Sequence, residues 1–102
     1  MLNINVLYIY PKIMEVNREI NLFRIIDKNL KETVVVYCEK LDNEYKIYIT
    51  NTMHGQVENI CSVNNLEELD IWMNKFRALE KDIISIDNLE NIEKYILKIY
   101  KK

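Results

Sequence analysis

The amino-acid sequence predicts an α+β domain of two layers, in the order β-α-β-β-β-α-α, with a small, mainly antiparallel sheet and helices packed on one of its faces. Three observations predict this fold: a β-rich N-terminal run, two alternating segments around a short polar turn, and two C-terminal segments with helical spacing. The 102 residues, of which 49% are hydrophobic, are typical of one compact domain over residues 1–102.

The N-terminal part is predicted to form a strand followed by a helix. Residues 2–10 are apolar on both faces towards their end, which is typical of a central strand covered on both sides. Pro11 fits the first turn of a helix because its φ is fixed near the helical value. Further apolar residues interrupt the helical stripe within residues 20–26, so that segment is also compatible with a strand, and we favour the helix. The stripe over residues 13–30 consists of Ile13, Val16, Ile20, Phe23 and Leu30.

Residues 33–40 and 44–50 are predicted to form a β-hairpin. Asp42 and Asn43, which tolerate positive φ, lie between them and suit a two-residue turn. Such a turn sets the register of every following pair. One face then carries the apolar residues Val36, Cys38, Ile47 and Ile49. The opposite face carries an ion pair, an aromatic pair and a third pair, namely Glu39–Lys46, Tyr37–Tyr48 and Val35–Thr50.

The next segments are predicted to add a third antiparallel strand and a helix. Gly55 supplies a turn before the strand over residues 56–63. Asn65 followed by Glu68 is a capping-box arrangement, in which each side chain satisfies a backbone donor. The apolar stripe of this helix is Leu69, Trp72, Met73, Phe76 and Leu79.

The C-terminal residues are predicted to form a last helix. Asp87 followed by Glu90 repeats the capping pattern, and Glu90 with Lys94 supports the exposed face. Residues 82–87 form a connection or a short strand. If residues 83–86 pair with the sheet, a ferredoxin-like βαββαβ arrangement is the alternative fold. The apolar stripe of the last helix is Leu89, Ile92, Ile96 and Ile99.

The scarce residues exclude several classes of enzyme. Gly55 is the single glycine, and phosphate-binding loops and dinucleotide fingerprints need several. One His and two Cys cannot supply the four ligands of a structural zinc site within one chain. We therefore expect no cofactor and no metal.

Cellular location and origin also follow from composition. No apolar run approaches the roughly 18 residues that span a bilayer, and the N-terminus lacks the pattern of a secretory signal. We expect a cytoplasmic protein without a membrane partner, in which Cys38 and Cys61 are reduced thiols. Sixteen Ile and thirteen Asn against one Ala indicate AT-rich coding, and hence a bacterial or phage origin.

Negative charge is concentrated in the middle of the chain. Residues 41–70 contain one basic and six acidic side chains, whereas the whole chain has a net charge of −2. This segment is suited to docking on a basic partner, and the alternative is a solvated surface with favourable charges at a helix start. Without a broad basic face, direct binding of nucleic acid is not expected. The acidic residues are Asp42, Glu44, Glu58, Glu67, Glu68 and Asp70.

Two apolar features are candidate contact sites for a partner protein. Tyr37, Tyr48 and Val35 form an exposed patch if helices cover only one face of the sheet. If a helix covers this face too, they are ordinary core residues, and we weigh the two alternatives equally. Ile71 lies off the apolar stripe of its helix, beside Asp70.

The candidates for catalysis are weak. His54 and Cys61 are the available thiol–imidazole pair, but no helix N-terminus or basic cluster is predicted beside Cys61 to lower its pKa. We interpret Cys61 as a small hydrophobic residue and Cys38 as core. Glu67, Glu68 and Asp70 lie at a helix start, where acids are stabilised whatever the function.

We therefore expect a non-catalytic protein-binding module. The favoured function is an inhibitor or immunity-type antagonist that occludes a larger partner, for example a nucleic-acid-processing protein of a bacterial or phage system. The alternative is a self-assembling structural subunit that forms a homo-oligomer. A thiol or carboxylate enzyme is less favoured.

Overall fold

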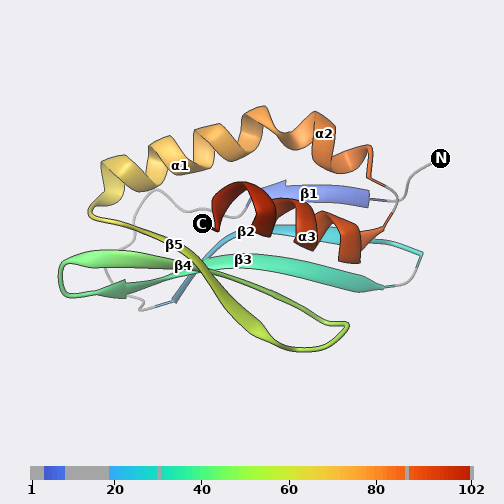
Figure 1. Ribbon diagram of the computed structural model, residues 1–102, viewed down its shortest axis with the longest axis horizontal. Helices are drawn as coiled ribbons and strands as arrows, with labels where there is room; N and C mark the ends of the chain where they lie inside the picture. The colour runs from blue at the N-terminus through green and yellow to red at the C-terminus, as the bar shows by residue number, and fades with distance from the viewer. Residues whose placement is uncertain (1–3, 9–18, 30, 87, 102) are drawn as a thin grey trace.

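The computed structural model describes residues 4–8, 19–29, 31–86 and 88–101. Within them, five strands are followed by three helices (Figure 1). The strands are β1 (Ile4–Tyr8), β2 (Glu19–Asp27), β3 (Glu32–Leu41), β4 (Glu44–Asn51) and β5 (Val57–Val63). The helices are α1 (Leu66–Ala78), α2 (Glu80–Ile84) and α3 (Leu89–Tyr100).

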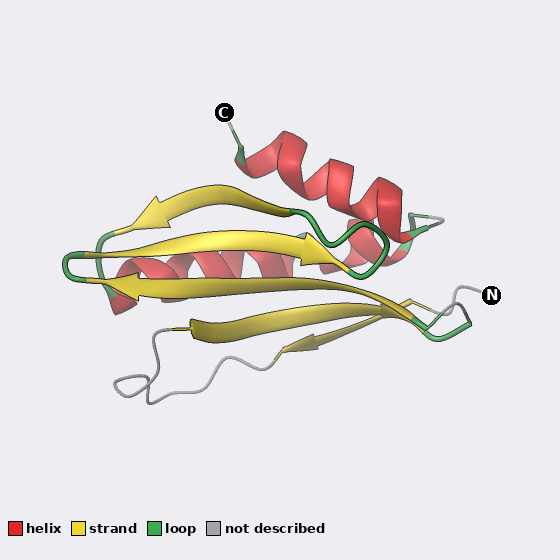
Figure 2. Cartoon of the chain, turned by 90° about the horizontal axis from the view of Figure 1, so that it is seen from below, coloured by secondary structure: helices red, strands yellow, loops and turns green. Residues whose placement is uncertain are grey.

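The strands form one antiparallel meander in the order β1-β2-β3-β4-β5. Figure 2 shows the sheet in front of the helices, so the fold has two layers with the described helices on one side. This confirms the predicted α+β class and the antiparallel sheet. The predicted element order is wrong, because the described strands all precede the described helices. None of the helices in the described ranges has the length and apolar character needed to cross a bilayer.

The largest error concerns β2, where the sequence favoured a helix. The pairing of β2 with β3 shifts between Asn21 and Phe23, which makes Leu22 the extra residue of a β-bulge. Leu22 and Phe23 are consecutive and both fully buried. The bulge thus brings Ile20 and Phe23, three residues apart, to the same face, and this spacing imitates a helix. The part of the predicted helix before Glu19, together with Leu30, lies outside the described residues.

The prediction that the first strand is central is also wrong. In the described sheet β1 is an edge strand that pairs with β2 alone. Ile4 is buried and Val6 packs against the core. A central position would require a crossover connection, whereas β2 returns directly alongside β1.

The ferredoxin-like alternative is wrong because residues 80–84 form α2 rather than a strand. Ile83 is fully buried, and half-buried Leu79 precedes it by four residues, so the two occupy one face of a helical turn.

The β3–β4 hairpin has the predicted register throughout. Leu41 pairs with Glu44, Tyr37 with Tyr48, and the other predicted pairs follow. The predicted ion pair needs correction: Lys46 Nζ lies 4.0 Å from Glu44 Oε1, so the ion pair of Lys46 is with Glu44 rather than Glu39. The third predicted strand and the helix after Asn65 are confirmed by β5 and α1.

The core lies between the sheet and the helices. Phe23 of β2 stacks on Phe76 of α1 with ring centroids 3.7 Å apart, and Trp72 packs beside both rings. Cys38 is fully buried, as predicted. The predicted stripe of α1 is buried as far as Phe76, whereas Leu79 is only partly buried at the end of the helix.

The helix starts show two changes from prediction. Asn65 Oδ1 accepts from Glu68 N at 2.9 Å as expected, but Glu68 Oε1 accepts from Asn64 N rather than from the cap residue itself. Asn88, not Asp87, caps α3, and its Oδ1 accepts from Asn91 N at 2.9 Å. Asp87 lies outside the described residues.

Along α3 the buried positions also depart from the predicted stripe. Ile99 is 37% exposed, whereas Glu93 is buried with Leu89, Ile92 and Ile96. A helix of 3.6 residues per turn places residues 89, 92, 93 and 96 along one stripe.

Candidate protein-binding surfaces

One face of the sheet carries no helix among the described residues, and we call it the open face (Figure 2). In β3 its side chains alternate with the fully buried Val34, Val36 and Cys38. In β4 they alternate in the same way with buried residues. The open face includes Asn21, Arg24, Val35, Tyr37, Glu39, Glu44, Lys46, Tyr48, Thr50 and Asn59.

Two tyrosines lie at the centre of the open face. The rings of Tyr37 and Tyr48 stack with centroids 5.4 Å apart and planes 23° apart. Both residues are half-buried, as is Val35 in the next pair along β3. The structure therefore places the predicted patch of Tyr37, Tyr48 and Val35 on the side of the sheet away from the helices.

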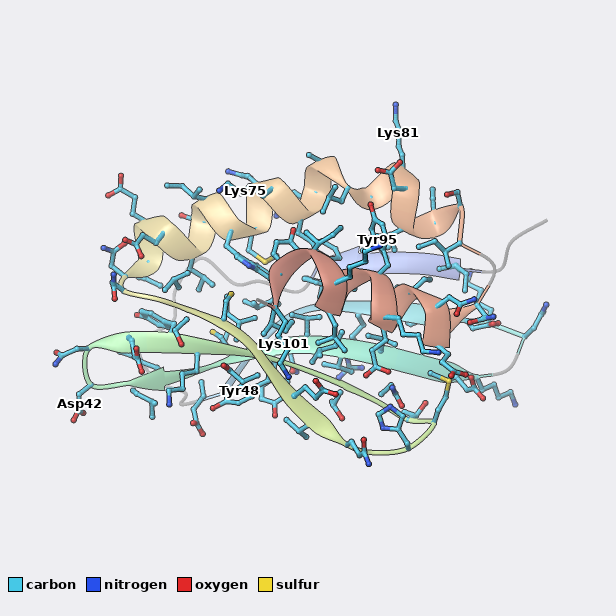
Figure 3. All side chains as sticks on the ribbon, in the orientation of Figure 1. Asp42, Tyr48, Lys75, Lys81, Tyr95 and Lys101 are labelled. Carbon is cyan, nitrogen blue, oxygen red and sulfur yellow. The ribbon has the colours of Figure 1, made fainter. Side chains whose placement is uncertain are left out.

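A second candidate surface lies at the end of the molecule where the β3–β4 turn meets the start of α1 (Figures 1 and 3). Asp42 is exposed in the turn and Glu44 begins β4. Glu67 and Glu68 occupy the first turn of α1. We call these four residues the acidic end. A shallow depression of about 410 Å³ separates the turn from the helix start and is lined by Lys40, Leu41, Asp42, Asn43, Glu44, Tyr45, Asn64, Asn65 and Leu66.

Of the other predicted acidic contact residues, Glu58 is engaged elsewhere, whereas Asp70 lies one helical turn after Glu67 on α1. Glu58 of β5 forms an ion pair with Lys101 after α3, with 2.9 Å between Oε2 and Nζ. Asp70 is exposed in α1, and its neighbour Ile71 is 49% exposed. The six acidic residues of the middle segment therefore do not form one continuous surface.

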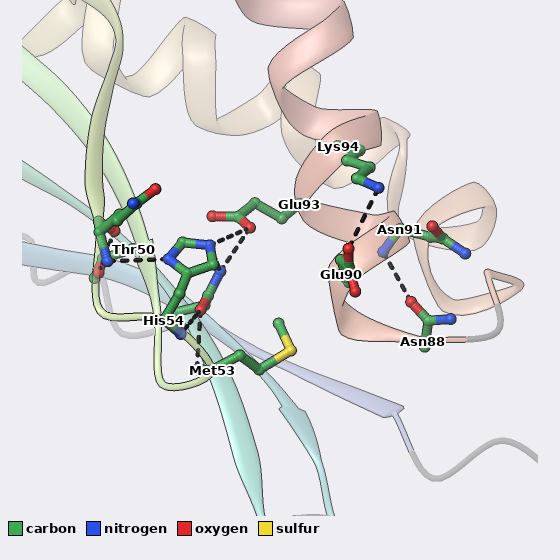
Figure 4. A network of polar contacts seen from close by, with 10 residues as sticks. Thr50, Met53, His54, Asn88, Glu90, Asn91, Glu93 and Lys94 are labelled. Atoms are coloured by element: carbon green, nitrogen blue, oxygen red, sulfur yellow. Dashed lines mark hydrogen bonds and ion pairs between the residues drawn. The ribbon is translucent and has the colours of Figure 1, made fainter.

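A polar cluster of Asn51, His54 and Glu93 joins the β4–β5 turn to α3 (Figure 4). Asn51 Oδ1 accepts from the backbone N–H of Met53 and of His54, at 2.9 and 3.0 Å. This fixes the orientation of its amide, whose Nδ2 donates to Glu93 Oε1 at 2.5 Å. His54 Nε2 lies 3.2 Å from the same oxygen.

The hydrogen bonds of His54 fix the tautomer of its ring. Its Nδ1 accepts from the backbone N–H of Gln56 at 3.0 Å, so Nε2 is the nitrogen that donates to Glu93. Asn51 Nδ2 lies 2.7 Å from His54 Nε2. Both nitrogens donate to the same oxygen, Oε1 of Glu93. Both ring nitrogens of His54 are therefore hydrogen bonded, and the cluster holds the turn against α3.

Sequence reasoning missed the role of Asn51 and Glu93, although both leave a signal. Asn51 continues the inward alternation of Tyr45, Ile47 and Ile49, so a polar side chain stands at a core-facing position. Glu93 likewise lies on the apolar stripe of α3. A buried polar group needs a hydrogen-bond partner, and these two satisfy each other.

The structure does not bring His54 and Cys61 together as a thiol–imidazole pair. The Cys61 thiol lies between β5 and α1; burial raises its pKa, and a contact with Trp72 lowers the pKa only in part. Burial raises the pKa of Cys38 to about 12. Both thiols are therefore protonated at neutral pH, and a thiol is a far weaker nucleophile than a thiolate.

No group of three or more His, Cys, Asp or Glu side chains in the described ranges is arranged to hold a metal ion. In comparisons with known proteins, no family model matches the chain, and no curated protein or solved structure is significantly similar to it.

Proposed function

We propose that this chain is a non-catalytic protein-binding module that acts by occluding a larger partner, as an inhibitor or immunity-type antagonist does. The observation that supports this proposal is the acidic end. Two segments more than twenty residues apart in the sequence bring Asp42, Glu44, Glu67 and Glu68 to one end of the molecule.

The chemistry of the acidic end favours a basic partner. Asp42 and Glu67 are exposed, and the adjacent depression between the turn and α1 can receive a long side chain. Clustered charges of one sign steer a partner of the opposite sign and contribute to the orientation of docking. A bacterial or phage protein that binds nucleic-acid phosphates has such a surface, and the carboxylates of this chain would compete with those phosphates.

An enzymatic function has less support. The imidazole of His54 is held by Gln56 and Glu93, and burial raises the pKa of both thiols. The carboxylates of α1 are at the helix start, where Glu68 is engaged in capping.

The experiment is affinity capture from a bacterial lysate with the tagged chain, followed by mass spectrometry. The test variant combines Asp42→Asn, Glu44→Gln and Glu67→Gln, and it spares the capping residue Glu68. The matched control combines Glu80→Gln, Asp82→Asn and Glu90→Gln, which removes the same formal charge from α2 and α3.

We expect the wild type and the control to capture the same basic protein, and the acidic-end variant to lose it. Capture should weaken as the salt concentration rises, because exposed charges are screened. Recovery of no specific partner, or of one that binds the acidic-end variant equally well, would contradict the proposal.

A further inference from the structure

The central row of the open face reads the same across the strands in either direction. Tyr37 pairs with Tyr48 at its centre, with Glu39–Lys46 on one side and Val35–Thr50 on the other. Asn21 pairs with Tyr37, and Asn59 pairs with Tyr48. The central row across four strands therefore reads Asn, Tyr, Tyr, Asn.

Consider a twofold axis that lies above the open face, parallel to the strands and over the midline between β3 and β4. Rotation about this axis makes the open face complementary to itself. When two copies meet face to face about that axis, β3 of one lies over β4 of the other. Tyr37 then lies over Tyr48 of the second copy, and Glu39 lies over its Lys46. A symmetric dimer requires such a surface, in which each contact occurs twice.

The charges of the open face favour this arrangement. Within the described part of the chain, Lys46 forms its ion pair with Glu44 at 4.0 Å, and Glu39 has no ion-pair partner. Glu39 is half-buried, so further loss of water would be costly without a cation beside it. The twofold axis supplies Lys46 of the second copy, and the four charges around the axis alternate in sign.

The geometry of sheet packing permits these contacts. Packed sheets lie about 10 Å apart with their strands within about 30° of each other. The angle between the two sheets displaces facing residues least where they lie close to the twofold axis. β3 and β4 flank that axis, so their contacts are affected least. Four strands spaced about 4.8 Å apart give a footprint on the order of 500 Å² for each copy. This is below the ~800 Å² per partner of a standard stable interface, so the dimer is expected to be weak.

We propose that two copies of this chain form a symmetric dimer through the open face, with Tyr37, Tyr48, Glu39 and Lys46 around the twofold axis. This inference does not depend on the proposed function, and the two surfaces adjoin only where Glu44 of the acidic end pairs with Lys46. Because the axis preserves the strand direction, both acidic ends lie at the same end of the dimer. A partner with two basic sites would then be bound by both copies at once.

The test is sedimentation equilibrium of the full chain from low to several hundred micromolar. Glu39→Lys and Lys46→Glu each place like charges opposite each other across the axis, and we expect each to weaken dimerisation at least tenfold. Mixed in equal amounts, the two variants carry opposite charges at every facing position and should form a heterodimer. Lys75→Glu on α1 is the control and should dimerise like the wild type.

Tyr48→Ala provides a second test, because it removes a ring beside the axis without changing the charge. It should also weaken the dimer at least tenfold. Circular dichroism and urea unfolding establish that each variant is folded, since Glu39 and Lys46 are also cross-strand neighbours within one sheet.

Three results would overturn the inference: a wild-type monomer at all concentrations, a dimer unaffected by these variants, or a mixture that fails to associate. The proposed function is separable from these results. The double variant Asp42→Asn with Glu67→Gln, which keeps Glu44 beside Lys46, should dimerise normally. A monomeric chain that still captures a basic partner would overturn the dimer alone.

Discussion

Glu93 of α3 accepts a hydrogen bond from Asn51 at the end of β4, with 2.5 Å between Oε1 and Nδ2. Both residues are buried, with exposed fractions of 6% and 3%. The bond connects the helical layer to the sheet, and the backbone N–H groups of Met53 and His54 hold the Asn51 amide in the orientation that makes it possible.

Asn51→Ala is therefore expected to destabilise the fold strongly. It leaves the Glu93 carboxylate without its closest donor and removes the acceptor for two backbone N–H groups. We expect the free energy of unfolding to fall by about 3 kcal/mol, the upper part of the range for a buried group deprived of its partner. Urea unfolding with linear extrapolation measures this change.

Glu93→Gln is the matched control, because it keeps an oxygen that can accept from Asn51 and removes only the charge. It should cost less than Asn51→Ala. The double variant Asn51→Ala with Glu93→Ala should cost less than the sum of the two single variants, since each single change leaves the other group unpaired. Additive costs would show that the two residues are not coupled.

The N-cap of α3 is open to a direct test. Asn88 Oδ1 accepts from Asn91 N at 2.9 Å, and replacement of such a cap by Ala costs about 1 kcal/mol. We expect Asn88→Ala to lower the free energy of unfolding by that amount and Asn88→Ser to restore most of it. Equal stability of both variants and the wild type in urea would rule out this cap.

The parts of the fold that sequence reasoning predicted correctly are governed by local signals. The polar turn at Asp42 and Asn43 sets the register of the β3–β4 hairpin, and every pair follows from it. Asn65 with Glu68 predicts the start of α1 because a cap involves residues only three apart.

The parts that were mispredicted depend on tertiary structure. The bulge at Leu22 changes the alternation of β2, and a single extra residue converts a strand pattern into one with helical spacing. The edge position of β1 depends on which strand pairs beside it, and no local signal carries that information.

The candidate surfaces follow the same division. Alternation along β3 and β4 predicts that Tyr37 and Tyr48 share a face with Val35, and the structure places them together. That the described helices leave this face uncovered required the structure, because no sequence pattern states whether a helix also packs on the side of Tyr37 and Tyr48. The approach of α1 to the β3–β4 turn, which creates the acidic end, is likewise a tertiary relationship.

The reactivity of Cys61 distinguishes a structural from a catalytic thiol. Burial raises its pKa, and His54 is hydrogen bonded to Gln56 and Glu93 instead. We expect iodoacetamide to alkylate Cys61 in the folded protein more slowly than a free cysteine at pH 8, and Cys38, which is fully buried, more slowly still. His54→Ala should leave the alkylation rate of Cys61 unchanged, as measured by mass spectrometry of tryptic peptides. Rapid alkylation that depends on His54 would restore the enzymatic hypothesis.

The buried thiol of Cys38 makes the fold sensitive to alkaline pH. Burial raises its pKa to about 12, whereas a thiol in the unfolded chain titrates near its ordinary value of about 8.5. Below the pKa of the unfolded chain, the folded and unfolded states both keep the thiol proton, and the contribution of Cys38 to stability is complete. Above it the unfolded state releases the proton while the folded state retains it, so the free energy of unfolding falls as pH rises towards 12. The slope from this one group is at most about 1.4 kcal/mol per pH unit.

Cys38→Val, which keeps an apolar side chain of similar size, should reduce this slope between pH 9 and 11 in urea unfolding experiments. Tyr100 is the matched comparison, because its pKa is also raised to about 12. Burial is the largest cause, and the neighbouring Cys61 and Tyr95 add to it. Because a tyrosine in the unfolded chain titrates near 10, Tyr100→Phe should flatten the profile only above that pH. It should cost little stability at pH 7, because the buried Tyr100 hydroxyl has no hydrogen-bond partner among the described residues. A Cys38→Val profile as steep as that of the wild type would show that other groups control the alkaline transition.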